Sequence, residues 1–328
     1  MCTAMSIVSK QQDVFFGRTM DFYYDLDLDI YIVPQNYTFK SNISNYKKKN
    51  KYAYIGIGQY IGEISLADGM NEAGLGVAAL YFPEYAEYTK KIDPKKIAIA
   101  NTEVVTYLLS HCKNIEEVAV ILSYTQIVGV KDDITKNISP LHWIVSDKTG
   151  KTITIEQTKN GLNILNNPIG VLTNSPDFAW HYTNLRNYMN LSPTSSKYEN
   201  WENIKLSPFG EGAGSIGLPG DFTPPSRFVR LAFAKSFAKK PNTEKETLLL
   251  CFHLMNLVSI PKGLVIAKEK IKMCDYTQYI AFMNLNTGDY FFNTYDNCNI
   301  RRANIKDNKT EKVICIGKLK SKMIINHV

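Results

Sequence analysis

The chain has 328 residues, of which 45% are hydrophobic and 21% charged, a composition typical of a globular protein with a large core. It has no run of about 18 apolar residues and no secretory signal at its start, so we expect no membrane insertion and a cytoplasmic location. The net charge of +7 comes partly from lysines at 47–51 and 90–96. Because no nucleic-acid-binding motif accompanies them, we interpret these lysines as solvated loops and expect no nucleic-acid partner.

The six cysteines are scattered, and none forms a Cys-x-x-Cys pair. This pattern argues against a zinc site or a disulfide framework, and it implies neither a metal nor another cofactor. Cys112 and Cys251 lie in apolar helical surroundings, so we expect them in the core. A reducing compartment suits the pattern and would keep Cys2 as a thiol.

Cys2 directly follows the first methionine, whose removal would leave a thiol and a free α-amine on one residue. An α-amine has a pKa of roughly 7.7–8.0, so near neutral pH it can take a proton from a neighbouring nucleophile. By position alone, a small residue in a frayed terminus is the simpler interpretation.

The residues that follow Cys2 favour a functional site over a frayed terminus. Segments 3–9 and 13–17 predict two strands joined by a short turn, which would tie the terminus into a sheet. Arg18 and Asp21 come straight after the second strand, a turn's distance from Cys2. An arginine near a thiol favours the thiolate, and an aspartate can orient an α-ammonium.

The rest of the chain alternates between strand and helix patterns. Further strands are predicted at 28–34, 52–57, 63–66, 74–81, 141–146, 152–156, 162–165, 278–285 and 290–295. Helices are predicted within 101–124, broken near 113–114, and at 177–189, 226–239 and 243–257, with caps at Asp177, Ser226 and Thr243. The dipeptide Asp68-Gly69 indicates a turn.

Polar segments at 35–50, 128–140 and 191–225 are expected to be loops. The last of them is long and rich in Ser, Gly and Pro, so it is a candidate binding rim or oligomer contact. No repeat or break in composition marks a boundary, so we expect one domain over 1–328.

Several motifs resemble the choloylglycine hydrolase family, which contains conjugated bile salt hydrolases and penicillin V acylases. The matching segments, in family order, are 1–3, 17–22, 67–75, 80–83, 172–176, 217–221, 226–228, 277–279 and 293–295. The resemblance implies an α+β N-terminal-nucleophile hydrolase fold, a four-layer αββα sandwich of two antiparallel sheets between helical layers. It also implies a homotetramer.

The resemblance further implies hydrolysis of a linear amide. Cys2 would attack the carbonyl, its α-amine would move the proton, and water would release the acid from a thioester. Arg18 and Asp21 belong to the motif beside this nucleophile. The implied oxyanion donors are the side-chain amide of Asn174 and the backbone N–H of Tyr81.

Arg227 matches the family arginine that polarises the site. Without the family context, Arg227 would be an arginine in a surface pair, Asn174 a turn residue before Pro176, and Tyr81 an aromatic residue at a strand end.

The sequence around Tyr81 resembles penicillin V acylases, whereas many bile salt hydrolases have asparagine there. Bulky residues near the mouth, Met20, Phe22 and Tyr24, suit either a phenoxyacetyl ring or a steroid. We therefore predict a penicillin V acylase, with a conjugated bile salt hydrolase as the alternative. A non-catalytic binding protein, with Cys2 blocked by Met1, is a further alternative. A papain-type protease is disfavoured, because the histidines are scattered and no Cys-Gly-x-Cys-Trp motif is present.

Overall fold

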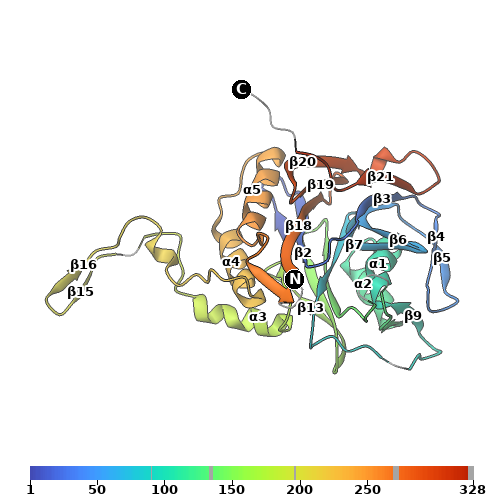
Figure 1. Cartoon of the computed structure of the whole chain (residues 1–328), viewed down its shortest axis with the longest axis horizontal. Coiled ribbons are helices and arrows are strands. Elements are labelled where there is room, and N and C mark those ends of the chain that lie inside the picture. Colours follow the sequence, from blue (N-terminus) through green and yellow to red (C-terminus); the bar gives the residue numbers. More distant parts are fainter. Residues whose placement is uncertain (90, 133–135, 196, 269–272, 324–328) are drawn as a thin grey trace.

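Two antiparallel sheets lie face to face at the centre of the molecule, and helices cover the outer face of each (Figure 1). The computed structural model describes residues 1–89, 91–132, 136–195, 197–268 and 273–323. This four-layer arrangement confirms the αββα fold that the sequence predicted.

The first sheet has the strand order β14-β1-β2-β18-β19-β20, and β17 pairs with β18 outside this row. Its strands are β1 (Cys2–Val8), β2 (Val14–Phe22), β14 (Val171–Leu172), β17 (Val265–Lys268), β18 (Met273–Asn284), β19 (Asp289–Thr294) and β20 (Asn297–Asn304). Because β2 lies between β1 and β18, the register sets Cys2 opposite Met20 on one side and Thr277 opposite Asp21 on the other.

The second sheet has the order β13-β12-β11-β8-β7-β6-β3-β21. Its strands are β3 (Asp29–Val33), β6 (Tyr54–Ile61), β7 (Glu63–Asn71), β8 (Leu75–Tyr81), β11 (Leu141–Asp147), β12 (Thr152–Thr158), β13 (Gly161–Asn166) and β21 (Ile314–Lys318). The ring of Phe16 on β2 packs against Gly76 on β8, where an added Cβ would lie 2.7 Å from the ring. Glycine thus lets the two sheets approach closely.

The helices divide between the two outer faces. They are α1 (Val104–His111), α2 (Ile115–Ser123), α3 (Phe178–Asn184), α4 (Pro224–Phe237) and α5 (Glu244–Asn256). α1 contacts β7 and β8, whereas α4 and α5 contact strands of the first sheet. One apolar cluster fills the space between the sheets and under α4 and α5, and a second lies under α1 and α2. Within the described ranges, no helix has the length and apolar character needed to cross a membrane.

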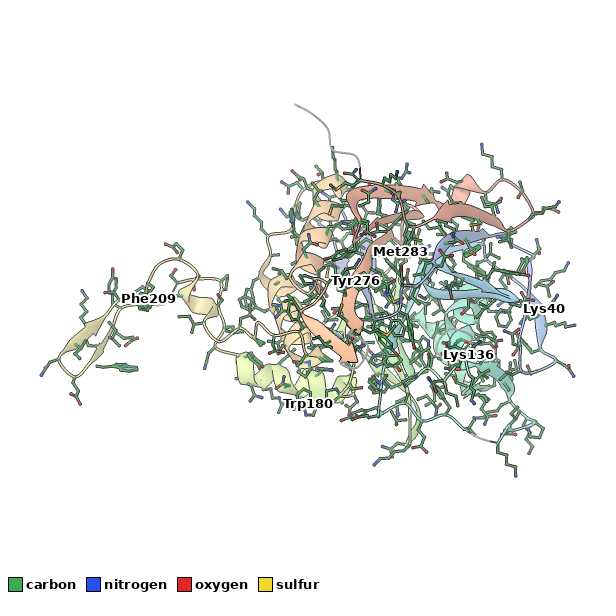
Figure 2. All side chains as sticks on the ribbon, viewed as in Figure 1. Lys40, Lys136, Trp180, Phe209, Tyr276 and Met283 are labelled. Carbon is green, nitrogen blue, oxygen red and sulfur yellow. The ribbon has the colours of Figure 1, made fainter. Side chains whose placement is uncertain are left out.

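Three short two-stranded sheets complete the described structure. They are the parallel pair β9 (Ile97–Ala100) and β10 (Thr125–Val128), and the hairpins β4 (Thr38–Lys40) with β5 (Lys47–Lys49) and β15 (Glu199–Trp201) with β16 (Ile204–Leu206). The β15–β16 hairpin ends an arm that extends away from the sandwich, and Phe209 lies far out on it (Figures 1 and 2). We use "the arm" for residues 191–195 and 197–222.

The structure confirms many sequence predictions. The break between the two helices of 101–124 falls at 112–114, as predicted, and both Cys112 and Cys251 are buried. Asp177 and Thr243 cap α3 and α5, because their side chains accept hydrogen bonds from backbone N–H groups of the first turn.

Several local predictions were wrong. Arg18 and Asp21 lie inside β2 and not after it, because pairing with β18 extends the strand to Phe22. Asp68 and its glycine lie inside β7 instead of forming a turn. α4 begins at Pro224, so Ser226 is not its cap; its hydroxyl donates to Asp221 instead.

The segments predicted as loops also differ in part. Hairpins β4–β5 and β15–β16 lie within 35–50 and 191–225, where the polar composition had indicated loops. In the predicted loop 128–140, residues 133–135 lie outside the described residues.

Candidate active site

The N-terminal hairpin places the Cys2 thiol against the side chain of Arg18. Cys2 is 4% exposed and Arg18 is fully buried. The Arg18 Nη2 donates to the Cys2 Sγ over 2.6 Å, while Nη1 donates to the carbonyl oxygen of Ala79 over 2.7 Å and Nε to that of Thr19 over 3.0 Å. A fixed cation at this distance stabilises negative charge on the sulfur.

Asp68 lies behind Arg18, and sequence reasoning did not identify it as a site residue. Its carboxylate accepts hydrogen bonds from the hydroxyls of Tyr279, at 2.5 Å, and Tyr290, and it lies 3.9 Å from the Arg18 Nε. Burial raises the pKa of Asp68, although Arg18 and both hydroxyls act in the opposite direction. The two tyrosine hydroxyls donate and the nearby guanidinium is a cation, which is the arrangement that suits a carboxylate.

The groups around Arg18 also shift the pKa of its own guanidinium. Burial alone would lower the pKa of Arg18, but the nearby Cys2, Tyr279 and Asp68 raise it above its ordinary value. The guanidinium is therefore a permanent cation beside the thiol.

Asp21 is also held from several sides. Its carboxylate accepts from the hydroxyls of Thr19, at 2.9 Å, and Thr277, at 2.6 Å, and lies 3.8 Å from the Nη1 of Arg227. Thr277 lies in the matching segment 277–279, but the sequence gave no sign of this contact, because 256 residues separate it from Asp21. These contacts fix the carboxylate close to the start of the chain.

Met1 continues the pairing of β1 with β2. Its α-ammonium donates to the Asp21 carbonyl oxygen over 2.5 Å and lies 3.8 Å from the Asp275 Oδ1, while the Asp21 N–H donates to the Met1 carbonyl. With Met1 attached, the nitrogen of Cys2 is an amide, and it donates to the Asn174 Oδ1 over 2.9 Å. Removal of Met1 would place the new α-amine of Cys2 beside Asn174 and Asp21.

Asn174 connects the parts of the site. Its Oδ1 accepts from the Cys2 N–H and, over 2.6 Å, from the Arg227 Nη2. Its Nδ2 donates to the carbonyl oxygen of Tyr81 over 2.6 Å. The side chain of Asn174 thus joins the nucleophile, the arginine on α4 and the end of β8.

Arg227 reaches into the site from the first turns of α4. Its Nη1 donates to the carbonyl oxygen of Cys2 over 2.6 Å and to the hydroxyl of Thr3, and its Nε donates to the carbonyl oxygen of Phe222 over 3.0 Å. Burial lowers the pKa of Arg227, while Asp21 and Cys2 act in the opposite direction. Arg227 is thus a buried cation, not the surface arginine that its sequence context alone suggests.

Two buried histidines support the backbone at Asn174. The Nε2 of His142 bonds to the carbonyl oxygen of Thr173 over 2.9 Å, and the Nε2 of His181 bonds to that of Asn174 over 2.8 Å. Burial lowers the pKa of His181 to about 4, so its ring is neutral at pH 7 and donates from Nε2. Sequence patterns gave no signal for these two hydrogen bonds. A backbone carbonyl is present at every residue, so the sequence does not show which one a histidine contacts.

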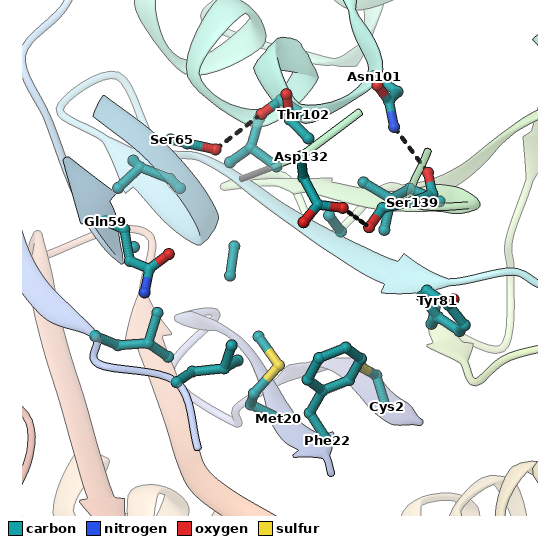
Figure 3. Close-up of a pocket in the computed structure, with 18 of the residues that line it drawn as sticks. Cys2, Met20, Phe22, Gln59, Ser65, Tyr81, Asn101, Thr102, Asp132 and Ser139 are labelled. Atoms are coloured by element: carbon teal, nitrogen blue, oxygen red, sulfur yellow. Dashed lines mark hydrogen bonds between the residues drawn. The ribbon is translucent and has the colours of Figure 1, made fainter. Parts of the chain in front are cut away.

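A pocket opens beside Cys2 between the ends of the two sheets (Figure 3). Its apolar lining residues are Met20, Phe22, Leu26, Leu28, Ile61, Leu66, Ala67, Ala79, Val105, Leu141 and Trp143, and Tyr81 also lines it. Met20 and Phe22 therefore lie where the sequence predicted. Tyr24 does not line the pocket; its ring packs on Tyr23 with centroids 4.5 Å apart.

Polar side chains line part of the same pocket. They are Gln59, Ser65, Asn101, Thr102, Asp132 and Ser139. Burial raises the pKa of Tyr81, and the charge of Asp132 adds to this effect. Within the described ranges, no group of three or more His, Cys, Asp or Glu side chains is arranged to hold a metal ion.

Comparison with known proteins identifies the family. A family model described as linear amide C–N hydrolases, choloylglycine hydrolase family, matches residues 2–315. The chain belongs to the choloylglycine hydrolase family. It is accordingly an enzyme that hydrolyses linear amide C–N bonds, as the sequence motifs predicted.

Relatives in this family are similar over the whole chain. A bile salt hydrolase/transferase from Clostridium perfringens is 37% identical over 332 residues and covers 100% of both chains. The crystal structure of a variant of the conjugated bile acid hydrolase from Clostridium perfringens superimposes with a TM-score of 0.91, at 35% identity and 100% coverage of both chains. A penicillin V acylase from Pectobacterium atrosepticum is 26% identical, covering 75% of this chain and 65% of the relative.

Proposed function

We propose that this hydrolase cleaves the amide bond of bile acids conjugated to glycine or taurine. The sequence motif at Tyr81 had favoured a penicillin V acylase, but the end-to-end similarity to the bile salt hydrolase/transferase supports the alternative. The observation that carries the proposal is the Cys2 thiol at the edge of a predominantly apolar pocket. Such a pocket suits a large hydrophobic acyl group whose carbonyl carbon lies at the sulfur.

In the proposed mechanism, Cys2 attacks the substrate carbonyl after Met1 has been removed. Its thiol proton passes to its own α-amine, which Asp21 orients, and Arg18 stabilises the sulfur anion. The α-ammonium then protonates the departing amine, which leaves a thioester on Cys2. The α-amine of Cys2 next takes a proton from water, and the hydroxide oxygen attacks the thioester carbonyl. The sulfur then leaves as a thiolate, which releases the bile acid and regains its proton from the α-ammonium.

The tetrahedral intermediate needs hydrogen-bond donors for its oxyanion. The Nδ2 of Asn174 and the backbone N–H of Tyr81 are the proposed donors, and the bond from Nδ2 to the Tyr81 carbonyl holds the two close together. Arg227 keeps the Asn174 amide in this orientation, because its Nη2 bonds to Oδ1.

The test compares hydrolysis of glycocholate, taurocholate and penicillin V by protein whose mass shows Met1 removed. We expect kcat/KM to be larger for the two bile salts than for penicillin V. The Cys2→Ala protein should lose turnover but keep its fold, whereas Cys298→Ser, at an exposed thiol, should retain activity. Faster cleavage of penicillin V, or normal turnover by Cys2→Ala, would overturn the proposal.

We infer that the arm joins copies of this chain into a homotetramer. Apolar side chains 64% to 108% exposed occur on it at Tyr198, Trp201, Ile204, Phe209 and Ile216. Exposed apolar side chains gathered on an extension suit contact with a second copy.

Light scattering measures this assembly directly. The wild type should have the mass of four chains, and a Trp201→Ser, Phe209→Ser double variant should dissociate. Tyr60→Ser, at a tyrosine 64% exposed on β6 of the sandwich, is the matched control and should leave the mass unchanged. A monomeric wild type would refute the inference.

A further inference from the structure

The chain that leads from β2 to β3 forms one wall of the pocket. We use "the wall segment" for residues 22–28, which have no helix or strand between the end of β2 and the start of β3. Phe22, Leu26 and Leu28 of this segment line the pocket, and Figure 3 shows Phe22 on the same side of it as Cys2. An acyl group with its carbonyl carbon at the sulfur would therefore contact the wall segment.

The side chain of Gln278 on β18 holds the backbone of the wall segment. Its Nε2 donates to the carbonyl oxygen of Phe22 over 3.1 Å and to that of Tyr24. Its Oε1 accepts from the N–H of Leu26 over 3.1 Å. Gln278 is 9% exposed and does not line the pocket, so it acts on the wall and not on the bound acyl group.

A bulge in β18 lies at Gln278. Thr277 pairs with Asp21 on β2, whereas Tyr279 pairs with Met20, so Gln278 is an extra residue without an opposite partner on β2. Bulges occur often beside active sites, where they change the direction of a side chain. Here the bulge lets the Gln278 side chain reach the segment that follows β2.

The motif at 277–279 thus serves both the reacting groups and the pocket. The Thr277 hydroxyl donates to the Asp21 carboxylate, and the Tyr279 hydroxyl donates to Asp68 behind the guanidinium. The side chain of Gln278, between them in sequence, bonds to the wall segment instead. A substitution at Gln278 should therefore affect the pocket and spare the nucleophile.

The charged contacts of the wall segment lie in water. Asp25 pairs with Lys320 over 2.5 Å and Asp27 pairs with Lys318 over 2.9 Å, and all four side chains are more than half exposed. Exposed ion pairs contribute little, because water screens them and the long side chains lose freedom in forming them. The bonds of the buried Gln278 amide are the stronger restraint on the segment.

We propose that Gln278 is a positioning residue that holds the wall segment in the shape that binds the acyl group. A wall that is ordered before the substrate arrives loses less conformational freedom on binding, so the acyl group binds more tightly. The chemical step is unaffected, since the side-chain bonds of Gln278 go to the wall segment. The inference rests on the proposed function, since the acyl group would be that of a bile acid conjugate.

The first variant is Gln278→Met, which keeps the length of the side chain but removes all three bonds. KM for glycocholate should rise about tenfold, because binding would have to order Phe22 and Leu26, while kcat should stay within about threefold of wild type. Gln11→Met is the matched control. Gln11 is exposed, and its Nε2 also donates to a backbone carbonyl, that of Asn242, so its loss should leave KM unchanged.

The second variant, Gln278→Glu, adds a readout in pH. An ionised carboxylate cannot donate to the two carbonyl oxygens, whereas the protonated acid can donate to one of them. Burial favours the protonated form, so the KM of this variant relative to wild type should fall as the pH is lowered from about 8 to about 5. The relative KM of Gln278→Met should not depend on pH.

A binding measurement completes the test. In the Cys2→Ala protein, Gln278→Met should weaken the binding of glycocholate about tenfold by calorimetry. An unchanged KM, or a fall in kcat with KM unchanged, would overturn the inference while the proposed function stands. If Gln278→Met does not fold, a relative KM of Gln278→Glu that is independent of pH would overturn it.

A wild type that cleaves penicillin V but not glycocholate would overturn the proposed function, and the same variants measured with penicillin V would then decide the inference. If the wild type neither binds nor cleaves either compound, both proposals fail.

Discussion

Thr277 offers a sharp test of how Asp21 is held. The Thr277 hydroxyl donates to the Asp21 Oδ1 over 2.6 Å and accepts from the Ile260 N–H over 2.8 Å. Thr277→Val keeps nearly the same shape but removes both bonds. Thr277→Ser keeps both bonds and removes only a methyl group.

The expected free-energy costs differ clearly between the two variants. A hydrogen bond to a charged group contributes about 1.5–3 kcal/mol, and a buried N–H left without a partner costs about 1–3 kcal/mol. Thr277→Val should therefore lower the free energy of unfolding by about 2.5–6 kcal/mol, the sum of the two contributions. Thr277→Ser should lose about 1 kcal/mol, the contribution of one buried methyl group.

Urea unfolding measures these costs, and turnover measures the effect on the site. A displaced Asp21 would misplace the α-amine of Cys2, so kcat of Thr277→Val should fall by about 10²-fold, whereas Thr277→Ser should remain close to wild type. Equal stability and equal kcat for the valine and serine variants would refute the reasoning, because the Thr277 hydroxyl would then neither stabilise the fold nor position Asp21.

Two further predictions concern buried charge and protonation. Burial lowers the pKa of His181 from 6.5 to about 4, so the unfolded chain binds its proton first as the pH falls, and the protein should lose stability between pH 6.5 and 4. In His181→Gln this loss, measured by urea unfolding at several pH values, should be smaller by up to about 1.4 kcal/mol per pH unit; an unchanged slope would contradict the assignment. Asp68→Asn should cost about 3–5 kcal/mol, because it leaves the charge of Arg18 buried without its partner. The milder Tyr290→Phe should cost about 1–2 kcal/mol in the same assay, and an Asp68→Asn protein as stable as wild type would show that the pair contributes nothing.

Local sequence patterns were sufficient to predict those elements in which the side chains themselves carry the signal. The N-terminal hairpin and the two-sided burial of β8 follow from alternation and from a continuous apolar run. The caps at Asp177 and Thr243 follow from short-range hydrogen bonds. The interactions that fix the hairpin and the caps are close in sequence, whereas β8 also pairs with the distant β11 and was recognised by its apolar run alone.

Edge strands were missed because backbone pairing, not side-chain burial, defines them. β20 reads Asn-Cys-Asn-Ile-Arg-Arg-Ala-Asn, with most of its side chains partly or fully exposed, and β21 is exposed over most of its length. Neither has the alternation that predicts a strand. Their partners, β19 and β3, were both predicted as strands, but the exposed side chains of β20 and β21 gave no sign that these segments pair with them.

The supporting residues of the site were missed for a related reason. The Asp68-Gly69 dipeptide favours a turn locally, but a buried cation and two tyrosine hydroxyls from distant strands hold Asp68 in β7. Thr277 contacts Asp21 across a separation of 256 residues. The motifs located the reacting groups, whereas the contacts that orient them exist only after the sheets have formed. The catalytic roles themselves stay predictions until the variants are measured.

The position of β18 at the side of β2 has a consequence for synthesis on the ribosome. β1 and β2 emerge first, yet the strand that covers the other edge of β2 follows some 256 residues later. At about 5–20 residues per second, this interval lasts on the order of tens of seconds. An apolar strand with an open edge is an aggregation hazard for all of that time. The nascent hairpin must therefore be shielded, or remain unpaired, until nearly the whole chain has been made.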